Sequence, residues 1–522
     1  MLTRRRLPLL CALLIAVLIA VAAIPLQRSS AAVSGFVQRC GIHFCLNGKA
    51  YYFAGANTYD VFTYGNGSND TETQYMDKAR IDNHFAELAA DHVSVLRLWM
   101  FSHETWHGFE PTKGVYNEQE FSEFDYILQS AANHGIRLIP TLENYWEAYG
   151  GIDTRLTWEG LGTGQSNRWR FFNKTACPGC FTQYKNYVNY ALNRVNHYSG
   201  VAYKNDPTIF AWDLMNEPRY EGQGTESTGG TTLRAWVDEM GAYIKGIDTN
   251  HMVYAGIEGH GTKYGFGGDE GNPFVYIQQS PYIDFTSAHP YPNEGWANLT
   301  QDQTITLINA WLADAHNVVG KPFYLGEFNT MGVDRSAWWT AIYNDLEAQN
   351  ADGSGFWWYP DPSAGGDNYS VKHGAAELAV FKAHSDRMIA KSGGTPPSGS
   401  PTTSSPSPSR STSPSASASS TGRGCTATYQ STGSWQGGFQ GQVTVTNPGT
   451  TATTGWTVTL TFANGQTITQ LWNGSYTQSG AVVTVKNVSY NGSLAPAAST
   501  AFGFLGSWNG TNAAPTLTCA AT

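Results

Sequence analysis

The sequence of 522 residues is poor in charged side chains, and a basic tract occurs only at its very N-terminus. Charged residues make up 14%, and 41 acidic against 31 basic side chains give a formal net charge of −10. Nucleic-acid-binding proteins normally carry a basic patch, so this balance argues against a nucleic-acid partner. Beyond the first 24 residues, no stretch of the sequence is apolar enough to cross a membrane.

The N-terminus has the layout of a secretory signal peptide. Arg4–Arg6 precede the apolar stretch Leu7–Ile24, and small residues follow at Ser30–Ala32. This order predicts a signal peptide over residues 1–32, cleaved after Ala32, and therefore a secreted, extracellular protein. The alternative is a membrane anchor, because the apolar stretch is long enough to span a bilayer.

Cysteine is also scarce: the sequence has seven, and six remain once Cys11 leaves with the signal peptide. An even number outside the cytosol favours disulfides. Cys40 and Cys45 flank an expected hairpin turn, Cys177 and Cys180 are close enough in the sequence to bond to each other, and Cys425 and Cys519 bracket a single segment, which suggests these three pairs. Cross-pairing among the first four of these cysteines stays open. Since no second Cys/His pair stands near Cys177, a structural bridge is favoured there over a zinc or redox site.

Aromatic residues, in contrast, are plentiful, at 13% with 17 tryptophans. Many Trp and Tyr side chains with few charges suit a neutral ligand that has flat faces and hydroxyl rims, as a sugar does. Large cores also use tryptophan, so the aromatic content suggests a carbohydrate ligand without fixing it.

Residues 392–424 consist almost wholly of Ser, Thr, Pro, Gly and Ala. Such a segment cannot bury a core, and we expect an extended linker there. It divides the mature chain into residues 33–391, a suitable size for a single barrel, and residues 425–522, a suitable size for a β-sandwich.

The larger segment alternates short apolar strands with helical patterns, which predicts the α/β class. Strands are expected at residues 51–57, 93–99, 136–143, 209–216, 252–257, 283–289, 322–327 and 355–359. Helices are expected between them at residues 77–90, 120–134, 183–197, 232–246, 304–318 and 336–348. Eight such strands favour a closed, parallel (β/α)8 TIM barrel. Residues 425–522 alternate in strand fashion between Gly, Asn and Pro turns, which predicts an all-β sandwich.

Two glutamates end predicted core strands of the barrel. Glu217 follows the fourth strand and Glu327 closes the seventh. Burying a carboxylate is costly, and barrels present their reactive groups at the C-terminal ends of strands. The pair therefore predicts cleavage of a glycosidic bond, with one Glu as proton donor and the other as nucleophile or base. Structural ion pairs are the alternative. The two residues are 110 positions apart, so only a closed fold brings them together.

Several motifs at the matching strands resemble glycoside hydrolase family 5 over residues 36–390. They are Asn216-Glu217-Pro218 on the fourth strand, Gly326-Glu327-Phe328 on the seventh, Leu96-Arg97-Leu98-Trp99 on the second, His289-Pro290-Tyr291 on the sixth and Phe356-Trp357 on the eighth. Within the family, the chain is similar to the endo-β-1,4-mannanases at Gly55–Tyr59, Trp99–Ser102 and Asn144–Gly151. Mannanases often have Asn-Asn-Trp where this chain has Asn144-Tyr145-Trp146. Cellulases of the family frequently carry a His after the third strand, and its absence here favours mannan over glucan.

The resemblance implies a role for each of these residues. Glu217 is the expected general acid/base, and Glu327 is the expected nucleophile of a retaining reaction. Arg97 and Tyr291 are expected beside Glu327, His289 beside Glu217, Asn216 at the 2-hydroxyl of the reacting sugar, and Trp357 beneath that sugar. Trp146 and Asn144 are further expected substrate contacts. This chemistry needs no cofactor and no metal, and the sequence shows no ligand cluster for a metal.

Alternatives remain for several of these residues. A buried acid that needs a partner also explains Arg97 on a core strand, and a hydrogen-bonded core position also explains His289. Trp358 competes with Trp357, because neighbouring strand residues point to opposite sides and the register is open. Asp213, near the end of the fourth strand, is interpreted as structural, with an unknown partner.

Residues 425–522 resemble carbohydrate-binding module family 2. Cys425 and Cys519 match its terminal disulfide, and Gly455-Trp456-Thr457 matches its buried tryptophan. The resemblance implies that Trp435, Trp472 and Tyr490 form a row of exposed rings that stack on crystalline cellulose, with Tyr490 at a position that is usually Trp. For Trp435 and Trp472 the alternative is a place in the sandwich core.

The sequence thus predicts a secreted, monomeric, retaining endo-β-1,4-mannanase that hydrolyses plant cell-wall mannans, namely mannan, glucomannan and galactomannan. The binding module is expected to hold it on cellulose, which raises its local concentration near those mannans. The alternatives are an endo-β-1,4-glucanase or an exo-acting β-mannosidase of the same fold, and a non-catalytic cell-wall binding protein.

Overall fold

The computed structural model describes residues 33–59, 63–65, 72–266, 268, 270–294, 297–361, 366–394, 424–435, 437–472, 474–488, 491–496, 498–508 and 511–522. The chain divides into two compact units, Met1–Thr403 and Ser404–Thr522. The predicted signal peptide and nearly all of the predicted linker lie outside the described residues. Within the described part of the chain, no helix is both long enough and apolar enough to span a bilayer.

The first unit is built on eight parallel strands in the order β10-β9-β8-β7-β4-β13-β12-β11. Their bounds are β4 Phe53–Thr58, β7 Val95–Trp99, β8 Arg137–Thr141, β9 Ala211–Asp213, β10 Met252–Tyr254, β11 Thr286–Ala288, β12 Phe323–Leu325 and β13 Gly353–Phe356. Two backbone hydrogen bonds of 2.8 Å, from Asp284 N to Val253 O and from His289 N to Glu258 O, join the ends of this sheet. The predicted TIM barrel is therefore confirmed.

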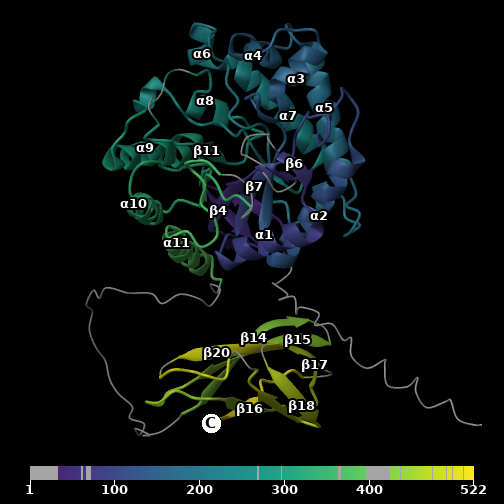
Figure 1. The fold of residues 1–522 in the computed structure, drawn as a ribbon, viewed down its shortest axis with the longest axis vertical. Helices are drawn as coiled ribbons and strands as arrows, with labels where there is room; N and C mark the ends of the chain where they lie inside the picture. The colour runs from purple at the N-terminus through teal and green to yellow at the C-terminus, as the bar shows by residue number, and fades with distance from the viewer. Residues whose placement is uncertain are drawn as a thin grey trace, which may run out of the picture. The chain divides into compact units, whose positions relative to one another are not determined.

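Helices connect the strands and surround them, as Figure 1 shows for α1, α2, α5, α9, α10 and α11. The helices are α1 Lys78–Ala90, α2 Glu118–His134, α3 Gly151–Trp158, α4 Gln165–Phe172, α5 Pro178–Asn193, α6 Thr225–Gly229, α7 Thr231–Ile247, α8 Phe274–Gln278, α9 Gln301–Asp314, α10 Arg335–Ala348 and α11 Leu378–Lys391. Local sequence sets their ends: Asp77 caps α1 by accepting from Arg80 N at 2.8 Å, and Thr300 and Gln303 form a capping box for α9. A π-helical turn, Ala315–Val319, follows α9.

The structure corrects two of the predicted elements. The eighth strand begins two residues earlier than predicted, at Gly353, where a Cβ atom would come within 2.3 Å of the Phe53 ring. This close packing requires a glycine, and because glycine is not typical of strands, the start of the strand was not recognised from the sequence. The helix predicted at residues 183–197 begins instead at Pro178, because a proline fits the first helical turn and Cys177 caps it.

Three short strands precede the barrel, β1 Val37–Cys40, β2 His43–Leu46 and β3 Lys49–Ala50, and they pair in antiparallel fashion. A second small pair consists of β5 Thr63–Gly65 and β6 Glu72–Tyr75. The disulfides are Cys40–Cys45, Cys177–Cys180 and Cys425–Cys519, so the three expected pairs are confirmed.

The second unit consists of two four-stranded antiparallel sheets, β14-β15-β20-β17 and β18-β19-β16-β21. Their bounds are β14 Thr426–Trp435, β15 Gly438–Thr446, β16 Trp456–Thr461, β17 Thr467–Trp472, β18 Ser475–Ser479, β19 Val482–Lys486, β20 Ser499–Ser507 and β21 Thr516–Ala521. Phe439, Trp456, Val458, Phe502 and Phe504 contribute to one core between the sheets. The all-β prediction is confirmed, and so is the burial of Trp456, which is 2% exposed.

Candidate active site

Glu217 and Glu327 meet at the C-terminal end of the barrel. Glu217 follows β9 and Glu327 follows β12. One oxygen of each carboxylate and one ring nitrogen of His289 all lie within 4.8 Å of one another. The chain turns sharply at Glu217, whose φ is 52°, and its backbone N–H donates to Gly256 O at 2.9 Å. Barrel closure thus brings together two carboxylates that are far apart in the sequence.

Two donors hold Glu327. Arg97 donates from Nη1 to Oε1 at 2.5 Å, and the Tyr291 hydroxyl donates to Oε2 at 2.6 Å. Burial, and next the negative charge of Glu327, raise the pKa of Tyr291 well above its ordinary value, so the phenol remains a neutral donor. With one cationic and one neutral donor, the Glu327 carboxylate is fixed in orientation.

Arg97 is fully buried beneath the site and bonds to several of its residues. Its guanidinium also donates to Asp213 Oδ2 at 2.9 Å, to Asn57 Oδ1 at 3.1 Å and to Asn216 Oδ1 at 2.8 Å. Asp213, interpreted from the sequence as structural with an unknown partner, is therefore the counter-ion of Arg97. A buried cation needs this full set of acceptors, since an unpaired one would be strongly destabilising.

Glu217 has different surroundings from Glu327. Trp146 donates its indole N–H to Oε2 at 2.7 Å, and His289 Nδ1 lies 3.0 Å from Oε1. Burial, followed by the charge of Glu258, raises the pKa of Glu217 despite the hydrogen bond with His289. Within the described residues no Arg or Lys is hydrogen-bonded to Glu217. The surroundings of the two carboxylates therefore differ, and those of Glu217 raise its pKa.

His289 lies between the two carboxylates, with Nδ1 also 3.7 Å from Glu327 Oε1. Burial lowers the pKa of His289, but the charges of Glu327 and Glu217 outweigh burial and raise it. The ring fits because residue 326 is glycine: a Cβ there would lie 2.9 Å from His289 Nε2. The Gly before Glu327 in the sequence motif is thus explained by this close approach.

Asn216 and Asn144 form a hydrogen-bonded pair beside the carboxylates. Asn216 Nδ2 donates to Asn144 Oδ1 at 3.0 Å. Asn144 is 1% exposed, and its side chain also bonds to Trp146 N and Ala148 O. Its contacts therefore position Asn216 and Trp146.

Of the two adjacent tryptophans after β13, Trp357 is the more exposed. Trp358 is 1% exposed and donates to Asp367 at 3.0 Å, whereas Trp357 is half-buried. Tyr59 stacks against both rings, with centroids 5.8 Å from Trp357 and 4.4 Å from Trp358. The ring centroid of Trp99 lies 5.7 Å from that of Trp357.

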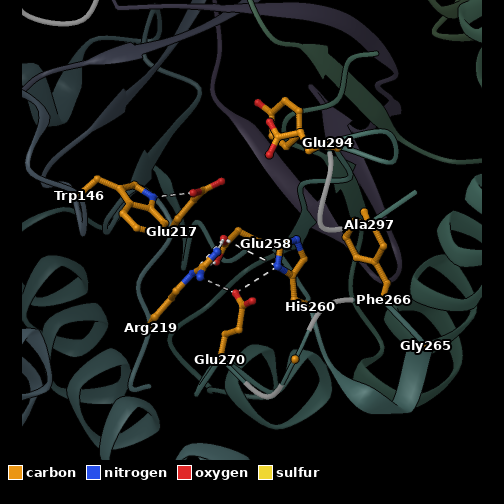
Figure 2. Close-up of a pocket in the computed structure, with 12 residues that line it drawn as sticks. Trp146, Glu217, Arg219, Glu258, His260, Gly265, Phe266, Glu270, Glu294 and Ala297 are labelled. Carbon is orange, nitrogen blue, oxygen red and sulfur yellow. Dashed lines mark hydrogen bonds and ion pairs between the residues drawn. The ribbon is translucent and has the colours of Figure 1, made fainter. Parts of the chain in front are cut away.

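A cavity of about 740 Å³ opens beside Glu217. Figure 2 shows Trp146, Glu217, Arg219, Glu258, His260 and Glu270 along its wall. Arg219 is paired with Glu258 and lies 2.6 Å from Glu270, and its guanidinium carbon is 4.8 Å from the centre of the Trp146 ring. The ion pairs thus fix Arg219 against the tryptophan that holds Glu217.

Sequence reasoning missed Arg219, Glu258, His260 and Glu270 as site residues. Two of these residues could have been found from their position in the sequence: Arg219 stands two residues after Glu217, and Glu258 follows β10. His260 and Glu270 lie in irregular loop segments. Hydrophobic periodicity does not reveal such positions.

The structure also corrects the prediction that the chain has no ligand cluster for a metal. Among the residues that the structure describes, three groups have ligand atoms within 4.8 Å of one another: Glu217, His289 and Glu327; Glu258, His260 and Glu270; and His43, His316 and Asp352. Each group combines residues from separate elements, so its members are not neighbours in the sequence.

In the second unit, Trp435 ends β14 and Trp472 ends β17, the two edge strands of one sheet. Trp435 pairs with Gly438, which pairs with Ser507 on β20, and Trp472 pairs with Gly503 on the same strand. The side chains of both tryptophans and the whole of Tyr490 lie outside the described part of the chain.

Comparison with known proteins agrees with this architecture. A family model described as GH family 5 beta-mannosidase-like matches residues 34–344, and a cellulose binding domain matches residues 425–521. Mannan endo-1,4-beta-mannosidase 3 of Arabidopsis thaliana is 32% identical over 374 residues, 66% of this chain and 86% of that protein. Mannan endo-1,4-beta-mannosidase 4 of Solanum lycopersicum is 35% identical over 308 residues, 56% of this chain and 73% of that protein.

Solved structures give the same result. The endo-1,4-beta-mannanase from Rhizomucor miehei aligns with a TM-score of 0.58 and 30% identity, over 68% of this chain and 100% of its own. A hyperthermostable endo-1,4-beta-D-mannanase from Thermotoga petrophila aligns with a TM-score of 0.54 and 25% identity, over 64% of this chain and 99% of its own. With a barrel, a pair of unequal glutamates and a family model over more than half of its length, the chain belongs to the β-mannosidase-like members of glycoside hydrolase family 5 and carries a C-terminal family 2 carbohydrate-binding module.

Proposed function

We propose that this chain is a secreted, monomeric, retaining endo-β-1,4-mannanase. Its substrates are internal β-1,4-mannosidic bonds in mannan, glucomannan and galactomannan of plant cell walls. The relatives in Arabidopsis and tomato carry the name mannan endo-1,4-beta-mannosidase, which supports mannan as the substrate class. The domains that we assign are a signal peptide over residues 1–32, the barrel over residues 33–391, a linker over residues 392–424 and the binding module over residues 425–522.

The observation that carries the mechanism is the short distance between two unequal carboxylates. Oxygens of Glu217 and Glu327 lie within 4.8 Å, which suits a retaining reaction, whereas an inverting one needs roughly 6.5–9.5 Å between the carboxyl groups for a water molecule. The raised pKa of Glu217 favours the protonated form that an acid catalyst needs. Glu327, held by Arg97 and Tyr291, is oriented for attack on the anomeric carbon.

The reaction then follows in two steps. Glu217 gives its proton to the leaving oxygen while Glu327 attacks the anomeric carbon and forms a glycosyl-enzyme. Loss of the charge on Glu327 lowers the proton affinity of Glu217, which then removes a proton from the incoming water. Asn216 binds the 2-hydroxyl of the reacting sugar, Trp357 lies beneath that sugar, and the positions of Asn144, Trp146 and His289 keep Asn216 and Glu217 in place.

For the second unit we propose adsorption to crystalline cellulose through Trp435, Trp472 and Tyr490. On β20, Gly503 is the pairing partner of Trp472, and Ser507 lies in the same row as Trp435 through Gly438. Gly503 and Ser507 alternate with the buried Phe502 and Phe504, so these two β20 positions belong to the sheet face that points away from the core. A module on cellulose raises the concentration of the barrel near the mannans that coat it.

A substrate panel tests the proposal. The purified mature protein is incubated with galactomannan, glucomannan and carboxymethyl cellulose, and both product sizes and the anomer released first are followed by NMR. Short oligosaccharides of mixed length from mannans, released as the β-anomer, are expected. Faster release from carboxymethyl cellulose would favour an endo-glucanase, mannose alone would favour an exo-acting enzyme, and no release would leave a wall-binding protein.

A further inference from the structure

His43, His316 and Asp352 form a cluster at the opposite end of the barrel from Glu217. Asp352 directly precedes β13, so it lies at the N-terminal end of the parallel strands. His43 comes from β2, which pairs with β1 in an N-terminal hairpin over residues 37–46, and His316 comes from the π-helical turn after α9. Three separate elements thus contribute two imidazoles and one carboxylate to a single point, and the proposed reaction uses none of them.

The geometry of the cluster is close to that of a set of metal ligands. His43 Nδ1 lies 2.7 Å from Asp352 Oδ1, and His316 Nε2 lies 3.3 Å from Asp352 Oδ2. One ligand atom from each of the three residues falls within 4.8 Å of the others. Ligand atoms about 2.0–2.1 Å from a tetrahedral Zn²⁺ are roughly 3.4 Å apart, so only small side-chain shifts separate this arrangement from a coordination shell.

We propose that His43, His316 and Asp352 form a binding site for a divalent transition metal, with Zn²⁺ as the best match. Two imidazoles and one carboxylate suit zinc, cobalt and nickel rather than calcium or magnesium, which prefer oxygen ligands alone. The bound ion fastens the N-terminal hairpin and the π-helical turn to the start of β13. The fourth position is taken by water.

Neighbouring groups already orient the ligands. Asn350 Nδ2 lies 3.2 Å from His43 Nε2, and turning this amide over places its Oδ1 there to accept the Nε2–H of a His43 that binds a metal through Nδ1. Phe323 N donates to Asp352 Oδ2 at 3.2 Å. Such outer contacts fix ring orientation and ligand basicity in metal sites. The Asp352 side chain is fully buried while that of His43 is 28% exposed, so an ion reaches the cluster from the hairpin side.

The other two groups of possible ligands are already engaged. Glu217, His289 and Glu327 are the proposed reaction centre. In the group of Glu258, His260 and Glu270, the guanidinium of Arg219 pairs with both carboxylates. In contrast, no Arg or Lys among the described residues forms an ion pair with Asp352. Lys391, whose Nζ lies 4.0 Å from the centre of the Tyr52 ring, acts on His43 through its positive charge. Lys391 opposes metal binding without occupying the site.

The test uses the full chain without a polyhistidine tag, treated with a chelator and then titrated with Zn²⁺ by calorimetry. We expect saturable binding and a higher Tm in the presence of Zn²⁺, because a ligand that binds the native state stabilises it. Cobalt added in place of zinc is expected to give the visible absorption of a low-coordinate Co²⁺ site.

Variants separate this site from others. His43→Gln and His316→Gln are each expected to weaken Zn²⁺ binding by about tenfold or more, and the double variant is expected to lower the stoichiometry by one ion. Lys391→Met is expected to tighten binding. His373→Gln is the matched control, because His373 also pairs with a buried aspartate, Asp91, that has Lys382 in place of a second imidazole. Unchanged stoichiometry and affinity in the folded double variant, or no Zn²⁺ binding by the unaltered chain, would overturn the proposal.

Discussion

The indole N–H of Trp146, a residue expected from the sequence to contact the sugar, donates at 2.7 Å to Oε2 of Glu217, the proposed acid/base. His289 Nδ1 lies 3.0 Å from the other oxygen of Glu217. Arg219, fixed by Glu258 and Glu270, lies 4.8 Å from the Trp146 ring. The cavity wall therefore connects through Arg219 and Trp146 to Glu217, the proposed proton donor.

Trp146→Phe is expected to lower kcat on galactomannan by about 10²-fold, because the proton donor loses the contact that aims it. The deficit should nearly vanish on an aryl mannoside with a highly acidic leaving group, which departs without a proton. Steady-state kinetics on both substrates measure the difference. Trp169→Phe, another partly buried tryptophan, which contacts Tyr220 edge-on, is the control and should leave both rates unchanged. Equal losses on the two substrates would mean that Trp146 does not act through Glu217.

Glu258→Gln is expected to move the alkaline limb of the kcat/KM profile to lower pH. Burial and then the charge of Glu258 raise the pKa of Glu217, and activity is lost as pH rises through that pKa, because the acid must be protonated. Removing the Glu258 charge lowers the pKa, so the loss begins at lower pH. The substitution also leaves the Arg219 cation less balanced, which acts in the same direction.

A pH profile of kcat/KM on glucomannan measures this shift. Glu258→Asp keeps the charge and should keep the limb close to its original position. Glu159→Gln, at an ion pair with Lys113 on the protein surface, controls for the change in net charge. An alkaline limb that stays in place in Glu258→Gln would show that the Glu258 charge does not reach Glu217.

Glu327→Ala is expected to reduce turnover by at least about 10⁴-fold, because no other group can form the glycosyl-enzyme. Azide is expected to restore part of the rate with an activated aryl mannoside, since a small anion fits the space left by the carboxylate. Adsorption to cellulose should stay unchanged, because the second unit has its own core. Parallel loss of hydrolysis and adsorption would contradict this division of labour.

Much of the barrel was predictable, because buried parallel strands appear in the sequence as apolar runs, and Glu217 and Glu327 follow two of these strands. The motif containing Arg97 predicted a partner for Glu327, and the structure shows that contact. What Arg97 binds on its other side was not predictable. Arg97 lies on β7 and its counter-ion Asp213 lies on β9. Only the closed barrel shows that these two strands present the two side chains to the same point.

The wall of the cavity was the least predictable part. Glu270 lies in an irregular segment after β10, and such a segment carries no periodic pattern that would place it beside Arg219. The role of Trp146 depends on the direction of one N–H bond, which composition cannot show. The hydrophobic pattern of the sequence therefore locates the strand ends. The contacts that set the proton affinity of Glu217 come instead from loops whose course depends on tertiary packing.

Trp472→Ala is expected to weaken adsorption of the full chain to crystalline cellulose by about fivefold, the loss of roughly 1 kcal/mol of ring stacking. Trp435→Ala should act similarly, and the double variant should adsorb more weakly than either. Binding isotherms on microcrystalline cellulose measure the effect. Tyr476→Ala is the matched control, because Tyr476 is 36% exposed but belongs to β18 in the other sheet. Hydrolysis of soluble mannan should be equal in all four variants, and unaltered adsorption by the folded double variant would place the cellulose-binding face elsewhere.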